Sequence, residues 1–239
     1  MKTDPELASL AARYALPDGA VTQLTALLVA LEADPHAPTT VRERERAIAT
    51  HLADSLVALE LPDVRAATAI ADLGAGAGFP GLPLAIALPR ARVALVESIA
   101  RKCAFIRAAA DAARLANVEV VAERAEAWSA GIGTCDVVTA RALAPLAVLA
   151  EYAAPLLREG GTLVAWKGRR SAEEERDAAA AADALGLAVE EIRPVIPYAG
   201  AEHRHLHVLR KVAPTPARFP RRPGMARKRP LGAKNRPTL

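Results

Sequence analysis

The seven residues Asp72–Gly78 read Asp-Leu-Gly-Ala-Gly-Ala-Gly, with three glycines at alternate positions behind an acid. Glycine accepts positive φ angles and lets backbone N–H groups approach a ligand closely. Pro80 and Pro83 follow, and proline is tolerated in the first turn of a helix, where a missing N–H costs no hydrogen bond. The stretch therefore predicts a ligand-binding turn between a strand and a helix.

Three interpretations of this turn are open. Gly76, Gly78 and Gly81 satisfy the dinucleotide fingerprint, and Glu97 lies about 20 residues on, where an acidic ribose ligand is expected. An acid that ends the strand before alternating glycines is instead typical of binding S-adenosyl-L-methionine, whose sulfonium and α-amino groups favour nearby carboxylates. A glycine-rich turn without a ligand is the third interpretation. The motif favours S-adenosyl-L-methionine, on which Asp72 could act directly or through the loop.

Charged residues also follow the later strand candidates. Glu97 ends the second strand and could accept both ribose hydroxyls, while Arg124 and Glu126 follow the third, where the adenine ring is expected. Arg141 follows the fourth strand, and a cation there is costly unless it is paired or faces a cleft. It could pair with the cofactor carboxylate or with a substrate phosphate. Lys167 ends the fifth strand, also toward the cleft mouth, although a lysine at a strand end is common.

Alternating strand and helix patterns must position these side chains. The predicted strands are Thr68–Leu73, Arg92–Glu97, Val118–Ala122, Asp136–Ala140 and Thr162–Lys167. The predicted helices between them are Pro80–Leu88, Ser98–Leu115, Pro145–Leu157 and Ser171–Leu185. This alternation predicts a parallel sheet with right-handed crossovers and helices on both faces. A final hairpin, Val189–Val195 and Leu206–Lys211, would give seven strands with one antiparallel. Three amphipathic helices are expected first: Pro5–Ala15, Asp18–Leu31 with Asp18 as its cap, and one around Thr40–Leu59.

Positive charge is concentrated at the end of the chain. The net charge is +4, but residues 211–239 hold nine basic and no acidic residues, which leaves 22 basic against 27 acidic residues in 1–210. A basic, Pro-rich tail is typical of a polyanion-binding arm. A solvated, disordered terminus is the equal alternative.

Composition bounds the remaining possibilities. There is no run of about 18 apolar residues and no apolar signal region, so we expect a cytoplasmic protein without a membrane span. Cys103 and Cys135 have no CxxC spacing and are expected to be buried. His203, His205 and His207 alternate along a strand, which favours a polar edge face over a metal site.

Taken together, these pieces resemble one family, the bacterial small-subunit rRNA guanine-N7 methyltransferases, also called the glucose-inhibited division protein B family. The matching segments are His51–Leu56, Asp72–Pro83, Lys102–Phe105, Arg124–Glu126, Val138–Ala142, Trp166–Gly168, Arg204–Leu206 and Phe219–Gly224. The chain departs from the family pattern at Ala37–Thr40, where an Asn-Leu-Thr segment is usual, and at Ala201–His203.

The resemblance implies an α/β fold of the class I (Rossmann-like) methyltransferase type, with a seven-stranded, mostly parallel sheet and an N-terminal helical extension. The implied organisation is a helical extension at 1–62, an S-adenosylmethionine-binding methyltransferase domain at 63–212 and a basic tail at 213–239. The expected cofactor-binding residues are Gly74, Gly76, Phe79, Glu97, Ser98, Ile99, Ala125, Glu126 and Arg141. No metal is expected.

The implied substrate is 16S rRNA in the small ribosomal subunit, methylated at N7 of one guanine by a monomeric enzyme. This nitrogen carries a lone pair and no proton, so it needs no general base, and the protein's contribution is mostly positioning. The candidate catalytic residues, expected on an RNA-facing rim, are Lys167, Arg141, Arg124, His51 and Arg204. Two alternatives remain: a nicotinamide-dependent oxidoreductase, from the glycine pattern, and a non-catalytic RNA-binding protein, from the basic tail.

Overall fold

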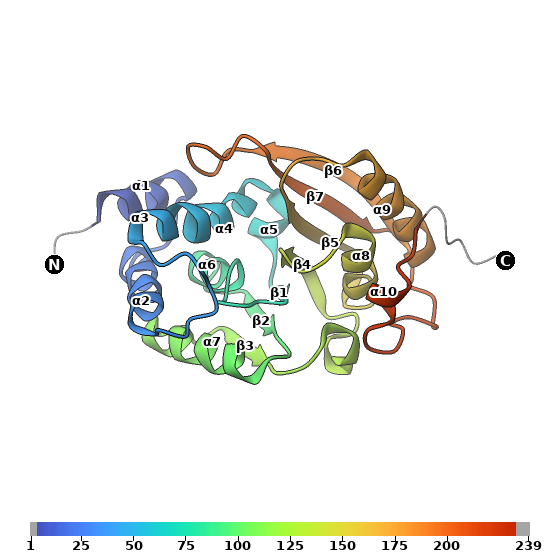
Figure 1. Cartoon of the computed structure of the whole chain (residues 1–239), viewed down its shortest axis with the longest axis horizontal. Helices are drawn as coiled ribbons and strands as arrows, with labels where there is room; N and C mark the ends of the chain where they lie inside the picture. Colours follow the sequence, from blue (N-terminus) through green and yellow to red (C-terminus); the bar gives the residue numbers. More distant parts are fainter. Residues whose placement is uncertain (1–3, 233–239) are drawn as a thin grey trace.

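The computed structural model describes residues 4–232, so the tail cations Lys234 and Arg236 and residues 1–3 lie outside the described residues. A seven-stranded sheet in the order β3-β2-β1-β4-β5-β7-β6 runs through the middle of the chain (Figure 1). The strands are β1 (Ala69–Leu73), β2 (Arg92–Val96), β3 (Val118–Val121), β4 (Cys135–Arg141), β5 (Leu157–Lys167), β6 (Leu187–Val195) and β7 (Arg204–Lys211). Strands β1 to β5 are parallel, and β7 runs antiparallel between β5 and β6. The predicted class I sheet with one antiparallel strand is confirmed.

The two faces of the sheet belong to two separate hydrophobic cores. Successive strand residues point to opposite faces, so Ile70 lies in one core and its neighbour Ala71 in the other. Strand β5 repeats this pattern, with Val164 in the first core and Ala165 in the second. Both faces are therefore covered, which explains why β1, β2 and β4 are nearly continuous apolar runs.

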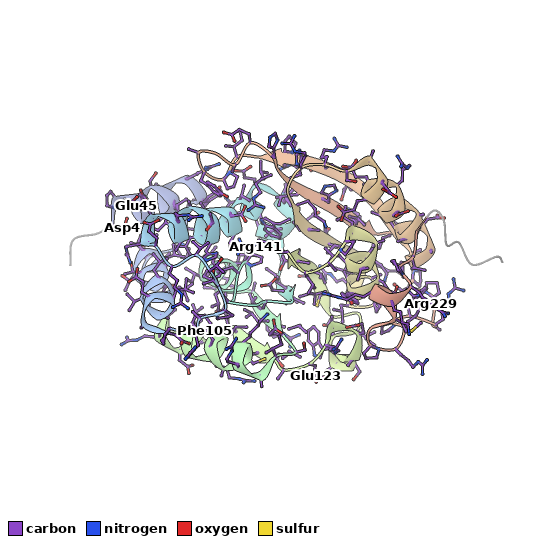
Figure 2. The ribbon with its side chains drawn as sticks, in the orientation of Figure 1. Asp4, Glu45, Phe105, Glu123, Arg141 and Arg229 are labelled. Carbon is purple, nitrogen blue, oxygen red and sulfur yellow. The ribbon has the colours of Figure 1, made fainter. Side chains whose placement is uncertain are left out.

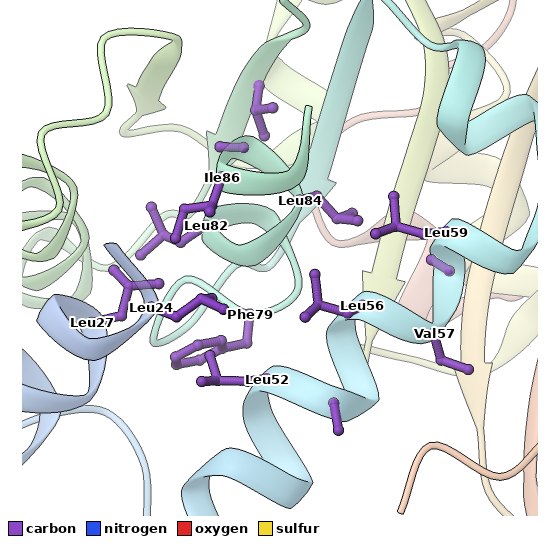
Figure 3. Packing of buried hydrophobic residues seen from close by; sticks show 14 of the residues in the cluster. Leu24, Leu27, Leu52, Leu56, Val57, Leu59, Phe79, Leu82, Leu84 and Ile86 are labelled. Carbon is purple, nitrogen blue, oxygen red and sulfur yellow. The ribbon is translucent and has the colours of Figure 1, made fainter. Parts of the chain in front are cut away.

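The N-terminal helices share the first core with two helices of the βα units. The segments on this face are α1 (Pro5–Tyr14), α2 (Ala20–Ala33), α3 (Arg44–Ala47), α4 (Asp54–Leu56), α5 (Pro62–Ala66), α6 (Gly81–Ala87) and α7 (Ala100–Ala112). Figure 3 shows Leu24 of α2 and Leu52 of the segment before α4 close to Phe79 and Leu82. Residues 4–60 are thus packed against this face of the sheet.

The second face carries α8 (Leu146–Ala153), α9 (Ala172–Leu185) and the short α10 (Met225–Lys228). Ser171 caps α9 by accepting the N–H of Glu174 at 3.3 Å, and Gly186 ends the helix with a left-handed φ of 76°. The glycine is required there, because a Cβ at this position would meet the Ala213 carbonyl oxygen at 2.4 Å.

Two helix starts differ from the prediction. Helix α2 begins at Ala20 with Gly19 as its cap, so the predicted cap at Asp18 is wrong; the left-handed φ of 83° at Gly19 takes the turn into the helix. The third predicted helix begins at Arg44 and not at Thr40, because the Glu43 carboxylate accepts the N–H groups of the first turn. It then continues as a π-helical stretch, Ile48–Ala53, and ends in the 3₁₀ turn Val57–Glu60.

The C-terminal segment, defined here as residues 213–232, is packed against the second face. Phe219, Ala226 and Leu231 are buried in the second core. Arg221 forms a bidentate ion pair with Glu151 of α8, and this carboxylate is almost fully buried. Neither a free polyanion-binding arm nor a solvated terminus therefore describes this part of the tail. Within residues 4–232, no helix is long and apolar enough to cross a membrane.

Candidate functional site

A cavity of about 570 Å³ opens where the parallel strands end. It is formed by the loops that follow β1, β2, β3 and β4, which is the edge where open α/β sheets bind ligands. Its size lies within the range of small-molecule sites. The lining residues are Gly74, Val96, Glu97, Ser98, Ile99, Lys102, Glu123, Arg124, Ala125, Glu126, Ala142, Leu143, Tyr152 and Arg227.

The glycine loop follows β1 as predicted, and Gly74 lines the cavity. Gly74 has a φ of 66°, and a Cβ there would meet the Leu143 side chain at 2.5 Å. Its N–H donates to the Val96 carbonyl oxygen at 2.8 Å, which ties the loop to the end of β2. The glycine is therefore needed for its backbone angle, and a side chain there would also require the Leu143 side chain to move.

Asp72 binds the start of α6 and does not line the cavity. Its carboxylate accepts the N–H of Gly81 at 2.9 Å and the hydroxyl of Thr139 at 3.0 Å. Burial raises the pKa of Asp72 to about 7, against the opposing effect of these two hydrogen bonds. The first N–H of α6 is thus used inside the protein and is not free for a phosphate, which disfavours the dinucleotide interpretation.

Glu97 is the buried acid of the cavity. One carboxylate oxygen accepts the N–H of Gly76 at 3.2 Å and the other accepts the N–H of Ile99 at 2.9 Å. The Lys102 ammonium lies 3.8 Å from the carboxylate oxygen that binds Gly76. These contacts hold the carboxylate in one orientation, and each oxygen keeps acceptor capacity for a ligand hydroxyl.

The opposite wall comes from the loop after β3, from α8 and from the C-terminal segment. Glu126 accepts the N–H of Gly224 at 2.9 Å, and Arg227 donates to the Leu143 carbonyl oxygen at 2.8 Å. The pKa of Tyr152 is raised, first by burial and next by the charge of Glu126, while Arg227 acts in the opposite sense. Residues 98 and 84 positions apart in sequence are thus joined by hydrogen bonds around the cavity.

A second cluster lies beside the cavity and centres on Asp54, a fully buried carboxylate. Arg141, near the middle of the view in Figure 2, donates to it at 2.8 Å, and Arg204 at the start of β7 lies 3.3 Å from its other oxygen. The backbone oxygen of Asp54 accepts the indole N–H of Trp166 at 2.7 Å. Asp54 therefore joins the N-terminal helices to the ends of β4, β5 and β7.

His51 and Phe79 form the aromatic part of this cluster. Their rings are stacked at 4.7 Å with an interplanar angle of 10°, and the Arg141 guanidinium lies 6.0 Å from the Phe79 ring centre. Thr39 bonds to the His51 ring at 2.9 Å. Burial, and then the Arg141 charge, lower the pKa of His51 to about 4, so its imidazole is neutral near pH 7.

Lys167 at the end of β5 is held by an ion pair. Its ammonium lies 2.5 Å from the Glu174 carboxylate and donates to the Ala144 carbonyl oxygen at 3.1 Å. Glu174 also accepts the N–H of Leu146, which starts α8. The lysine is half-buried, so a substrate phosphate would have to compete with Glu174 for it.

The predicted site residues thus lie partly around the cavity and partly outside its lining. The cavity is lined by Gly74, Glu97, Ser98, Ile99, Arg124, Ala125 and Glu126. Phe79, Arg141, His51 and Arg204 belong to the Asp54 cluster, Lys167 lies at the end of the neighbouring strand β5, and Gly76 supports Glu97 from below.

Sequence reasoning missed several contributors, of which three matter most here. Tyr152 and Arg227 line the cavity, and Asp54 organises the neighbouring cluster. Asp54 carried a signal, because it stands in a segment that matched the family. Arg227 carried none, since only the folded path of the C-terminal segment brings it to the cavity. The described residues contain no group of three His, Cys, Asp or Glu side chains arranged to hold a metal ion.

Comparison with known proteins identifies the family that this chain matches. Residues 22–206 match the family described as GidB, rRNA small subunit methyltransferase G. The chain is 45% identical to Ribosomal RNA small subunit methyltransferase G of Chloroflexus aggregans, over 81% of this chain and 82% of the relative. It is 43% identical to the protein of that name from Rubrobacter xylanophilus, over 80% and 75% of the two chains.

Solved structures agree on the fold. A predicted O-methyltransferase from Agrobacterium tumefaciens, 29% identical, superposes with a TM-score of 0.52 over 68% of this chain and 80% of that one. Fibrillarin from Aeropyrum pernix, solved with S-adenosyl-L-methionine, gives a TM-score of 0.52 at 18% identity, over 66% and 72%. The fold, the cavity at the strand ends and a match spanning most of the sequence agree: the chain belongs to the rRNA small subunit methyltransferase G family.

Proposed function

We propose that this protein transfers a methyl group from S-adenosyl-L-methionine to N7 of one guanine in 16S rRNA of the small ribosomal subunit. The observation that carries the proposal is the cavity beside the glycine loop, with a buried, oriented Glu97, in a chain of this family. The oxidoreductase alternative is not favoured, because the family is one of methyltransferases and the first N–H of α6 is already bonded to Asp72.

The residues around the cavity suit the proposed cofactor. Glu97 would accept the two ribose hydroxyls, which are neutral donors matched to a carboxylate already held by two N–H groups. Ile99 and Leu143 supply apolar surface for the faces of a flat base, and Ala125 and Glu126 supply polar groups for its edge. Such a division between apolar faces and few polar contacts is usual in small-molecule sites.

The reaction depends on the positioning of its two reactants more than on acid–base groups of the protein. S-adenosyl-L-methionine supplies an electrophilic methyl group on a sulfonium. The N7 lone pair forms the new N–C bond as the C–S bond breaks, and the positive charge passes to the guanine. No proton is removed, so a neutral His51 with its pKa near 4 is compatible with the reaction. Holding the two reactants in line can supply about 7–11 kcal/mol of the barrier reduction in well-oriented systems.

The RNA-facing rim is proposed to consist of the cations at the strand ends. Arg124 is exposed at the cavity, whereas Arg141 and Arg204 share the Asp54 carboxylate. Lys167 is paired with Glu174. Phosphate contacts fix register and orientation and do not read sequence. We therefore assign these four residues to substrate orientation. We also propose that the protein acts as a monomer in the cytoplasm. The proposed functional divisions of the chain are residues 1–62, 63–212 and 213–239.

The test incubates the protein with labelled S-adenosyl-L-methionine and, separately, unmodified 30S subunits, naked 16S rRNA and tRNA. Formation of 7-methylguanosine in one of the 16S-containing samples is expected. Glu97→Gln should weaken cofactor binding about tenfold or more through the loss of a charge-assisted hydrogen bond. Glu119→Gln, an exposed acid on β3 away from the cavity lining, is the matched control. Absence of 7-methylguanosine from both 16S-containing samples, whether or not tRNA is methylated, would overturn the proposal.

A further inference from the structure

The C-terminal segment closes one side of the cavity that the strand-end loops form. Arg227 is the one cavity-lining residue that comes from beyond β7 within the described chain, and it belongs to the short α10. We propose that Arg227 is a ligand-binding residue of the methyl-donor site, placed over the base of the cofactor by the packed C-terminal segment. This inference rests on the proposed function and deepens it.

The segment is anchored well enough to place a side chain. The Arg221 guanidinium donates to both carboxylate oxygens of Glu151 and also to the Arg229 carbonyl oxygen. Glu151 has only 1% of its surface exposed, so separating this pair would leave a buried carboxylate without its counter-charge. Ala226, next to Arg227, is buried in the second core. Arg227 therefore projects from a fixed point of the backbone.

Two contacts place Arg227 at the base end of the cavity and not at the ribose end. Its guanidinium donates to the Leu143 carbonyl oxygen, and the Gly224 N–H at the start of α10 binds the Glu126 carboxylate. Leu143 and Glu126 are the residues proposed to meet the face and the edge of the base. Lys102, the cation beside Glu97, occupies the ribose end.

The chemistry of arginine suits this position. A planar guanidinium stacks on aromatic planes and keeps its charge at every physiological pH. Arg227 is exposed in the cavity wall, so a purine that enters would gain both a stacking surface and shielding from water. Ligands that carry the purine should depend on Arg227, and the methionine part alone should not.

Calorimetry with S-adenosylhomocysteine tests the assignment on the full chain. Arg227→Ala should weaken binding about tenfold, the loss of one stacking and hydrogen-bonding group. Lys228→Ala is the matched control, because it removes an exposed cation from the neighbouring position of α10, and it should stay within about twofold of the unaltered protein. Arg227→Lys should recover only part of the lost affinity, since an ammonium keeps a cation–π contact but lacks the planar surface of the guanidinium.

A measurement without substitution supports the same test. Hydrogen exchange of residues 217–232 should slow when S-adenosylhomocysteine is added, and methionine alone should leave it unchanged. If the unaltered protein binds no S-adenosylhomocysteine, the proposed function itself is overturned. If it binds but Arg227→Ala binds equally well, or if Lys228→Ala loses as much, only the assignment of Arg227 is overturned.

Discussion

Replacing Asp54 by Asn is expected to lower the free energy of unfolding by about 3 kcal/mol. At 2.8 Å from Arg141 and 3.3 Å from Arg204, an effective dielectric constant near 20 gives attractions of roughly 6 and 5 kcal/mol, much of which desolvation offsets. The Arg141 side chain is 14% exposed and would be left without its counter-charge, which costs about 3–5 kcal/mol for buried pairs.

Two features reduce this cost. Arg204 is 33% exposed and can turn toward water, so its pair is worth little, about 1 kcal/mol or less. The Asn amide oxygen also keeps one hydrogen bond with Arg141, worth about 1 kcal/mol. The remaining loss of about 3 kcal/mol corresponds to roughly a hundredfold change in the folding equilibrium.

Urea unfolding followed by tryptophan fluorescence measures this loss. Both tryptophans are buried, and Trp166 donates to the backbone of Asp54, so its emission reports on the cluster directly. Glu60→Gln is the control, because it breaks the exposed Arg13–Glu60 pair and should cost less than about 0.5 kcal/mol. Equal losses in the two variants would refute the claim that Asp54 holds the N-terminal helices to the strand ends.

Further outcomes follow from the same contacts. Because the folded-state pKa of His51, about 4, lies below its unfolded value near 6.5, the unfolded chain takes up the extra proton and stability falls as pH drops through this window. His51→Gln should remove up to about 3 kcal/mol of that pH dependence in urea unfolding measured between pH 7 and pH 4. Lys167→Ala should slow RNA methylation by at least about tenfold and leave cofactor affinity unchanged. Glu174→Gln frees the lysine and should retain activity. If Lys167→Ala is as active as the unaltered protein, the residue does not belong to the RNA-facing rim. Arg221→Gln should lower the free energy of unfolding by about 2–4 kcal/mol, because its partner on α8 is buried, and the exposed Arg222→Gln should change it by under about 0.5 kcal/mol in the same assay.

The sheet could be predicted from sequence because its signals are local. Alternating apolar runs and glycine or proline turns defined all seven strands to within a few residues, except β5, which begins five residues earlier at Leu157. The helix capped by Glu43 was placed too early, since glutamate is a less common cap than serine, threonine or aspartate.

The candidate site was predictable only in part. Glu97 and Glu126 follow strand ends, so the rule for parallel sheets places them at the cavity. Arg141 obeys the same rule, yet its guanidinium pairs with Asp54, a partner 87 positions away that no local pattern connects to it. Arg227 reaches the cavity only because the ion pair between Arg221 and Glu151 holds the C-terminal segment against α8.

The packed C-terminal segment also bears on when the site becomes complete during synthesis. Domains generally begin to fold from the N-terminal side as the chain emerges at about 5–20 residues per second. A nascent chain that has reached the end of β7 can already form the sheet and place Glu97, yet it lacks the wall that Gly224 and Arg227 supply. Full cofactor affinity would then arise late, after the sheet has formed, so a stalled or truncated chain would compete poorly with the finished enzyme for cofactor.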